Sequence, residues 1–256
     1  MSNLVNPHGG GALKSLLAPK PERADMLAKA QDLPKVPMTS RELSDLFMLG
    51  MGAYTPLDGF MGEADWRGVC TDMKLASGLF WPIPITLSAS TEIADAIAAG
   101  SDVALTDGET GEIMGVMRVD EKYIIDKTLE CESVYKTADE AHPGVQKVLA
   151  QGDVNLAGPV TALSEGEYPA KYPDLYYRPA ESRALFTEKG WTKVAAFQTR
   201  NPMHRSHEYL AKIAVEVLDG VFIHQVLGAL KPGDIPAETR TQAIQAMIDN
   251  YFVPGT

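Results

Sequence analysis

Val194-Ala-Ala-Phe-Gln-Thr-Arg-Asn-Pro-Met-His-Arg-Ser-His207 is the stretch that decides the fold of the carboxyl-terminal third of the chain. Its first four residues form a short apolar run, typical of a buried strand. A polar loop follows, and then an amphipathic helix predicted over residues 204–218, with Leu210, Ile213, Ala214 and Val217 on one face. The Asp219-Gly pair breaks that helix before a second apolar run. Strand, helix and strand within about 35 residues predict a parallel crossover unit.

The loop between this strand and helix is the candidate site, because ligands of parallel sheets bind beyond the carboxyl ends of the strands. Arg200 offers a planar, permanently charged fork that matches an oxyanion, and Gln198 and Asn201 add neutral donors. His204 and His207 are spaced to share one face of the first helical turn. Free backbone N–H groups at that turn also favour anions. The pattern therefore predicts binding of phosphate, sulfate or a leaving pyrophosphate.

A His-x-x-His pair has other interpretations. It also occurs as a structural or surface pair, and with a third ligand it forms a zinc site, although no third ligand is evident here. Cationic side chains in a first helical turn are mildly unfavourable for the helix dipole, so we expect an anionic ligand to offset that cost. The chain has no glycine-rich phosphate loop after the strand, which leaves the histidines rather than glycine backbone to hold a nucleotide.

Composition excludes several classes of function. The chain has 256 residues, 45% of them hydrophobic, and a formal net charge of −11, which disfavours an extended nucleic-acid interface. Its two cysteines, Cys70 and Cys131, form no metal-type or disulfide framework and fit a reducing compartment. No apolar run approaches the roughly 20 residues that span a bilayer. We therefore expect a cytoplasmic protein that binds neither membranes nor nucleic acid.

The amino-terminal part predicts a compact mixed-β domain. A capping box at Thr39 and Glu42 begins a helix that Gly50 is expected to end. From residue 81 to about 126 the pattern is that of strands, starting with residues 81–87 and including a hairpin over residues 103–119. A second Thr-x-x-Glu box, from Thr137 to Glu140, predicts a helix through Leu149.

Residues 168–179 combine three prolines with four tyrosines and predict an ordered connector without helix. Pro179 is expected to be the first residue of the next helix, over residues 180–189. The predicted domains are residues 1–180 and residues 181–256.

The loop also carries a family resemblance. Gln198-Thr-Arg-Asn-Pro-Met-His-Arg-Ser-His-Glu208 resembles the signature of the ATP sulfurylases, within the wider group of His-x-x-His nucleotidyltransferases. Four other segments resemble parts of that family in the same order: residues 7–10, 41–46, 52–60 and 231–235. The resemblance implies a PUA-like amino-terminal domain, followed by the first half of a Rossmann-like nucleotidyltransferase domain. The expected fold class is therefore α/β with a mixed-β amino-terminal domain.

The same resemblance implies a reaction and a set of roles. ATP sulfurylases join ATP and sulfate into adenosine 5'-phosphosulfate and pyrophosphate, by in-line attack of sulfate on the α-phosphorus, with Mg²⁺ on the nucleotide phosphates. It implies sulfate binding by Gln198 and Arg200, and nucleotide binding by those two together with Thr199, Asn201, His204 and His207. The implied catalytic residues are Thr199, Arg200, Asn201, His204 and His207. No protein-bound metal is predicted, and the family commonly forms homo-oligomers.

Two further hypotheses remain beside this one. A His-x-x-His adenylyltransferase acting on another acceptor, such as a vitamin-derived phosphate, keeps the chemistry but changes the substrate. A non-catalytic RNA-binding role is the other, because PUA-like domains often bind RNA, although the net charge opposes it. The chain also lacks the family's Gly-Arg-Asp-His-Ala segment. We therefore expect these 256 residues to be part of a longer protein, binding ligand weakly and turning over poorly by themselves.

Overall fold

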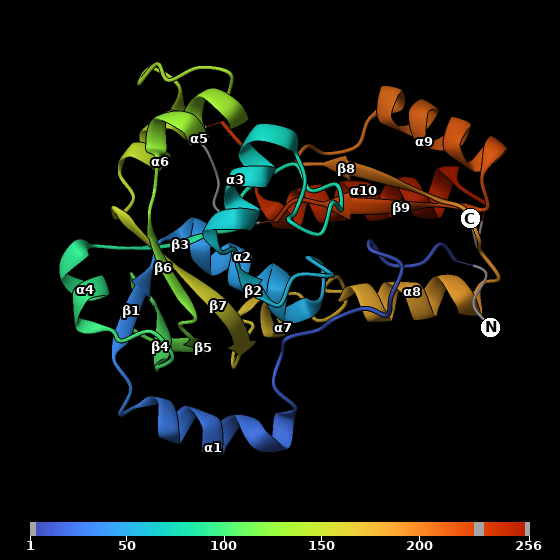
Figure 1. Ribbon diagram of the computed structural model, residues 1–256. Helices are drawn as coiled ribbons and strands as arrows, with labels where there is room; N and C mark the ends of the chain where they lie inside the picture. Colours follow the sequence, from blue (N-terminus) through green and yellow to red (C-terminus); the bar gives the residue numbers. More distant parts are fainter. Residues whose placement is uncertain (1–3, 228–232, 254–256) are drawn as a thin grey trace. The chain divides into compact units, whose positions relative to one another are not determined.

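The computed structural model describes residues 4–227 and 233–253 (Figure 1). The chain forms two compact units, one of residues 6–180 and one of residues 181–256 together with the first five residues. Each unit contains buried apolar clusters of its own.

The unit of residues 6–180 is built on a mixed sheet of seven strands. Its strands are β1 (Lys35–Met38), β2 (Gly59–Phe60), β3 (Leu87–Ala89), β4 (Asp102–Asp107), β5 (Ile113–Arg118), β6 (Glu121–Ile124) and β7 (Val154–Ala162). The order is β1-β4-β5-β7-β2, and β3 and β6 also pair with β7. Only β1 and β4 pair in parallel; every other pairing is antiparallel. Long strand β7 thus organises the sheet by pairing with four others.

Short helices surround this sheet: α1 (Lys20–Ala30), α2 (Ser40–Met51), α3 (Glu63–Asp72), α4 (Thr91–Ala96), α5 (Lys127–Val134), α6 (Pro143–Leu149) and α7 (Tyr168–Lys171). The core contains Trp66, which is fully buried, and its indole N–H donates to the buried Glu130 carboxylate at 2.7 Å. The mixed-β character expected from the hairpin pattern is therefore confirmed, with β4 and β5 forming that hairpin.

Several local predictions were wrong, each for a physical reason. Helix α2 continues past Gly50 and ends at Gly52, whose φ of 85° is the left-handed conformation that glycine adopts easily. Residues 81–86 form no strand, since the prolines at 82 and 84 remove ladder donors. The second Thr-x-x-Glu box begins no helix, because α6 starts at Pro143 with His142 as its cap. The tyrosine-rich connector does contain a short helix, α7.

The predicted capping box of α2 is present and tied to the sheet. The Glu42 carboxylate accepts the backbone N–H and hydroxyl of Thr39 at 2.8 and 2.7 Å. It also accepts the backbone N–H and hydroxyl of Ser88, in β3, at 2.7 and 2.8 Å. Glu42 is 0% exposed. One buried carboxylate therefore caps a helix and joins it to a strand.

Replacing Glu42 with alanine is expected to destabilise this unit by about 3 kcal/mol, because it leaves buried donors without an acceptor and removes a helix cap. Urea unfolding followed by tryptophan fluorescence measures the change. Glu63→Ala is the matched control. Its carboxylate forms a largely exposed i,i+4 pair with Arg67, so the expected loss is about 0.5 kcal/mol or less. Equal losses in the two variants would contradict the proposed importance of the buried network.

The other unit is a strand–helix repeat, as the sequence predicts. Helix α8 (Pro179–Glu188) leads into β8 (Val194–Thr199), α9 (Arg205–Val217), β9 (Gly220–Gln225) and α10 (Ala237–Tyr251). Strands β8 and β9 pair in parallel from Val194 opposite Gly220 to Thr199 opposite Gln225, which confirms the crossover unit. Side chains of α9 and α10 join one apolar cluster with those of the two strands.

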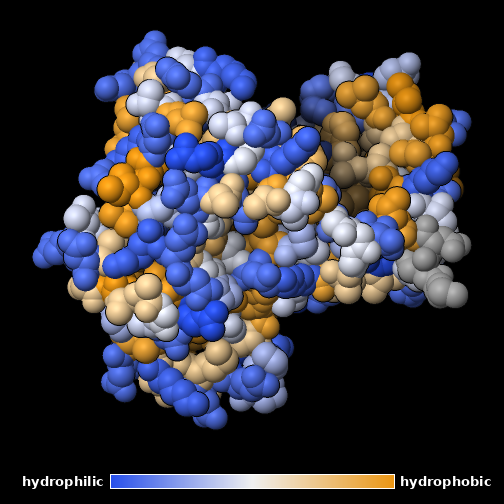
Figure 2. All heavy atoms as spheres, viewed as in Figure 1, coloured by the Kyte–Doolittle hydropathy of each residue, from blue (hydrophilic) through white to orange (hydrophobic). Residues whose placement is uncertain are grey.

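The apolar stripe of α9 is wider than its contact with the sheet. Ala211, Ala214 and Val215 belong to the cluster with the strands. Leu210, Ile213 and Val217, which the sequence placed on the same face as Ala214, are exposed instead, and hydrophobic side chains gather over α9 in Figure 2. The helix is therefore apolar on more of its circumference than one sheet covers.

None of the helices within residues 4–227 and 233–253 has both the length and the apolar character that a membrane-spanning helix needs.

Candidate active site

The loop after β8 starts with a turn closed by its own side chain. The Thr199 hydroxyl is buried, accepts the backbone N–H of Asn201 at 3.0 Å and donates to the Asn201 carbonyl at 3.2 Å. Backbone N–H of Val226, just after β9, donates to the Thr199 carbonyl at 2.9 Å. Thr199 therefore lies where the carboxyl ends of β8 and β9 meet, and its hydroxyl closes the turn that carries Arg200.

The two histidines cap α9 reciprocally. His204 is the N-cap residue, and its Nδ1 accepts the backbone N–H of Ser206 at 3.3 Å. Nδ1 of His207 accepts the backbone N–H of His204 at 3.2 Å. The ring centroids lie 4.0 Å apart, and the His207 ring also contacts the edge of Phe197 in β8. The sequence therefore predicted the pairing of the two rings correctly, although helix α9 begins one residue later than expected.

This capping arrangement fixes the tautomer of both rings. A ring nitrogen that accepts a hydrogen bond carries no proton, so the proton of each neutral imidazole lies on Nε2. Both Nε2–H groups are then available as donors beside the amino end of α9. The two rings therefore offer an anion a pair of oriented N–H donors.

The two histidines were expected to act as cationic groups that destabilise the first turn of α9 and need an anion to offset that cost. Because their Nδ1 atoms accept backbone N–H groups of that turn, the two rings instead stabilise the helix in the absence of ligand. Arg205 is also neutralised, because it pairs with Glu208 at 2.7 Å.

Burial, and secondarily the proximity of His204, lower the pKa of His207 below its usual value. The folded state therefore favours neutral His207, and the unfolded chain binds more protons near and below pH 6.5. The stability that neutral His207 contributes is therefore present above pH 6.5, and it is lost as the pH falls through the pKa of His207 in the folded protein.

We expect the unfolding temperature of the 181–256 unit to decrease when the pH is lowered from 7.5 to 5.5, and we expect His207→Leu to weaken this dependence on pH. His8→Gln, in the other unit, is the control; an unchanged pH profile in His207→Leu would contradict the assignment.

Arg200 is present at the loop but is engaged by a carboxylate. Its guanidinium Nη2 forms an ion pair with Oδ2 of Asp234, a partly buried residue ahead of α10. This partner is not predictable from the sequence, because 34 residues separate the two side chains and no spacing rule links them. An anion that binds Arg200 must therefore share or displace the Asp234 carboxylate.

Gln198 and Asn201 occupy different positions around the loop. The Gln198 amide lies 3.3 Å from Nδ1 of His224, its register partner on β9, and both side chains are exposed. The Asn201 side chain is exposed. Lys231, the first residue of the segment 231–235 that resembles the family, lies outside the described residues.

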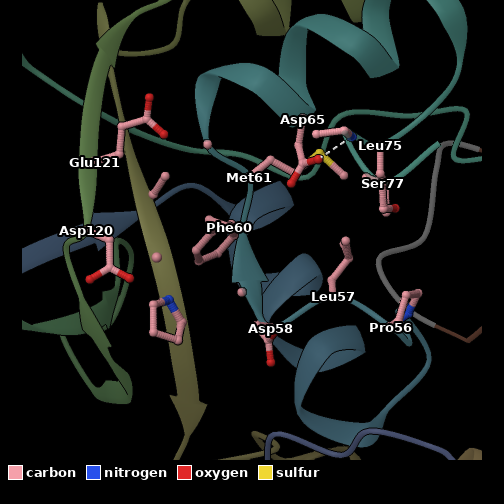
Figure 3. A pocket seen from close by; sticks show the side chains of 16 residues that line it. Pro56, Leu57, Asp58, Phe60, Met61, Asp65, Leu75, Ser77, Asp120 and Glu121 are labelled. Atoms are coloured by element: carbon pink, nitrogen blue, oxygen red, sulfur yellow. Dashed lines mark hydrogen bonds between the residues drawn. The ribbon is translucent and has the colours of Figure 1, made fainter. Parts of the chain in front are cut away.

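A concave region lies in the unit of residues 6–180. It has a volume of about 520 Å³ and an apolar floor that includes Leu57, Phe60 and Met61. Figure 3 shows the carboxylates around it, which belong to Asp58, Asp65, Asp120 and Glu121. Each of them already has a partner: Lys14, the Ala76 N–H, Arg118 and the Glu63 N–H. An acidic rim repels anions, so this cavity is not the predicted anion site.

Two family models match the chain. The model of a PUA-like domain matches residues 5–165, and the model named ATP-sulfurylase matches residues 173–256. Relatives agree over the whole chain: it is 59% identical over 256 residues to the sulfate adenylyltransferase of Thiobacillus denitrificans. The chain therefore carries a PUA-like domain followed by an ATP-sulfurylase segment. The predicted resemblance and the predicted fold class are thereby confirmed.

Other sulfate adenylyltransferases are similarly close. The chain is 60% identical over 258 residues to that of Syntrophobacter fumaroxidans and 58% identical over 259 residues to that of a Psychrobacter species. These matches include all of this chain but only 63%, 63% and 62% of the Thiobacillus, Syntrophobacter and Psychrobacter relatives. The chain thus spans less than two thirds of the length of these ATP sulfurylase relatives.

A solved structure agrees with the fold. The chain is similar to a protein described as a hexameric APS kinase from Thiobacillus denitrificans, with a TM-score of 0.72 and 28% sequence identity. The similarity covers 99% of this chain and 45% of that one.

The ATP sulfurylase resemblance also implies Mg²⁺. Within the described part of the chain, no group of three or more His, Cys, Asp or Glu side chains is arranged to hold a metal ion. The loop itself provides imidazole, amide and guanidinium groups, which suit phosphate oxygens better than Mg²⁺.

Proposed function

We propose that this protein is a sulfate adenylyltransferase, which forms adenosine 5'-phosphosulfate and pyrophosphate from ATP and sulfate. The observation that carries the proposal is the pair of Nε2–H donors at the amino end of α9, next to Arg200 in sequence. The match to the ATP-sulfurylase family model and the 59% identity to a sulfate adenylyltransferase support this chemistry over an adenylyltransferase with another acceptor.

In this proposal Arg200 binds sulfate through its fork, helped by the Gln198 amide. The ion pair with Asp234 keeps the guanidinium oriented until sulfate arrives. Thr199 acts through the turn that it closes, whereas the exposed Asn201 amide is available to sulfate or phosphate oxygens. Sulfate is a weak nucleophile, so positioning it in line with the α-phosphorus is the main contribution expected of these groups.

His204 and His207 are proposed to donate their Nε2 protons in hydrogen bonds to the phosphate oxygens. Negative charge moves toward the leaving pyrophosphate in the transition state, and fixed donors stabilise it without reorganising. No covalent intermediate is involved. Mg²⁺ enters as part of the MgATP substrate and neutralises phosphate charge.

Assembly and location are part of the same proposal. We infer a homo-oligomer, which the hexameric state named for the similar solved structure supports. We infer a cytoplasmic location from the low cysteine content and from the supply of ATP there.

The test of the proposal is synthesis of ATP from adenosine 5'-phosphosulfate and pyrophosphate with Mg²⁺, measured by luminescence, together with sulfate-dependent pyrophosphate release from ATP. The protein expressed from its complete gene should perform both reactions. Vitamin-derived phosphates, offered as acceptors in place of sulfate, should release no pyrophosphate. Release with such a phosphate and none with sulfate would overturn the proposal. The 256-residue chain alone, assayed in parallel, is expected to show little turnover.

A further inference from the structure

Arg240, on the first turns of α10, is a buried cation that the proposed chemistry does not yet use. The residue is 2% exposed. Its Nη1 donates to two backbone carbonyls, those of Arg200 and Val226, each at 2.8 Å. Its Nε is buried without a hydrogen-bond partner. The guanidinium therefore lies between the loop after β8 and the chain that leaves β9.

These contacts hold one peptide group of the loop at both ends. The carbonyl of Arg200 accepts from Arg240, and the N–H of the same peptide, on Asn201, donates to the Thr199 hydroxyl. Because that peptide plane is fixed, the point from which the Arg200 side chain leaves the backbone is fixed as well. Arg240 thus contacts the backbone of Arg200 rather than its side chain.

The charge of Arg240 has no carboxylate partner among the described residues. Arg200 pairs with Asp234, and Arg205 pairs with Glu208, whereas Arg240 contacts only carbonyl oxygens. A buried cation without a counter-charge is unfavourable, and carbonyl dipoles offset only part of that cost. An anion bound at the carboxyl ends of β8 and β9 would supply the missing negative charge.

We propose that Arg240 is a positioning residue of the anion site. It fixes the peptide that carries Arg200 and supplies a buried positive charge that bound pyrophosphate or adenosine 5'-phosphosulfate compensates. The inference rests on the proposed function for the identity of the ligand, but the role in holding the loop is independent of it.

The test compares Arg240→Met and Arg240→Lys with the wild type, in the protein expressed from its complete gene. The methionine variant keeps apolar volume and helix propensity but removes the positive charge and the hydrogen bonds to the carbonyls of Arg200 and Val226. We expect it to lower kcat for ATP synthesis by about 10²-fold and to weaken pyrophosphate binding by about 10-fold. The lysine variant, which keeps the charge, should recover pyrophosphate binding more than it recovers kcat. Gln242→Met, an exposed substitution on the same helix, should match the wild type.

Two additional measurements separate the possible outcomes. Hydrogen exchange at residues 199–203 should speed up in Arg240→Met at a temperature where circular dichroism shows the variant folded. Pyrophosphate binding, measured by calorimetry, tests the charge without any turnover. If the wild type lacks activity but these two differences persist, the proposed function fails and the role of Arg240 stands. Unchanged exchange and unchanged pyrophosphate affinity in folded Arg240→Met would overturn the role itself.

Discussion

Replacing His204 or His207 with alanine is expected to lower the turnover of adenylyl transfer by about 10²-fold or more, with little change in the fold. Each ring presents an Nε2–H donor whose direction is set by a backbone hydrogen bond to Nδ1. Removing one donor leaves charge on the leaving pyrophosphate less stabilised in the transition state. Steady-state rates of ATP synthesis from adenosine 5'-phosphosulfate and pyrophosphate measure the loss. Near-normal rates in both variants would contradict the assigned role.

Asparagine at position 204 separates the capping role of this residue from its catalytic role. Asparagine is a favourable N-cap and can accept the Ser206 N–H, as the Nδ1 atom of His204 does. It is too short to place a donor where Nε2 lies. His204→Asn should therefore unfold at nearly the wild-type temperature and yet lose as much activity as His204→Ala. Wild-type activity in His204→Asn would show that only the cap matters.

Arg200→Lys is expected to reduce kcat/KM for adenosine 5'-phosphosulfate by about 10²-fold, because an ammonium group cannot reproduce the bidentate fork. The matched variant is Asp234→Asn, which removes the carboxylate paired with Arg200. Since that carboxylate competes with an anionic ligand, Asp234→Asn should strengthen the binding of sulfate as measured by calorimetry. Unaltered kcat/KM in Arg200→Lys would exclude this arginine from the sulfate site.

The strand–loop–helix corner was predictable because its signals are local. Apolar runs, a break at Asp219-Gly220 and helical periodicity lie within one short stretch, and the structure has β8, α9 and β9 there. The spacing of His204 and His207 likewise predicted that their rings meet. The roles of Gln198, Thr199, Arg200, Asn201 and the two histidines as ligand contacts remain predictions.

Features that depend on distant residues were not predictable from the pattern. Asp234 and Arg240 follow the loop by more than 30 residues, and only the tertiary fold brings them to Arg200. Strand β7 passes through Gly158 and pairs with four other strands, and no local pattern indicates those distant partners. Local rules also failed where two signals competed, as when Pro143 set the start of α6 instead of the Thr137 box.

The most direct test of the central claim is a crystal structure of the protein with adenosine 5'-phosphosulfate bound. The account predicts the sulfate group on the Arg200 guanidinium and phosphate oxygens within about 3 Å of Nε2 of both His204 and His207. Their Nδ1 atoms should keep the backbone hydrogen bonds seen without ligand. A ligand bound elsewhere, or imidazoles turned so that Nδ1 faces the phosphate, would contradict the account.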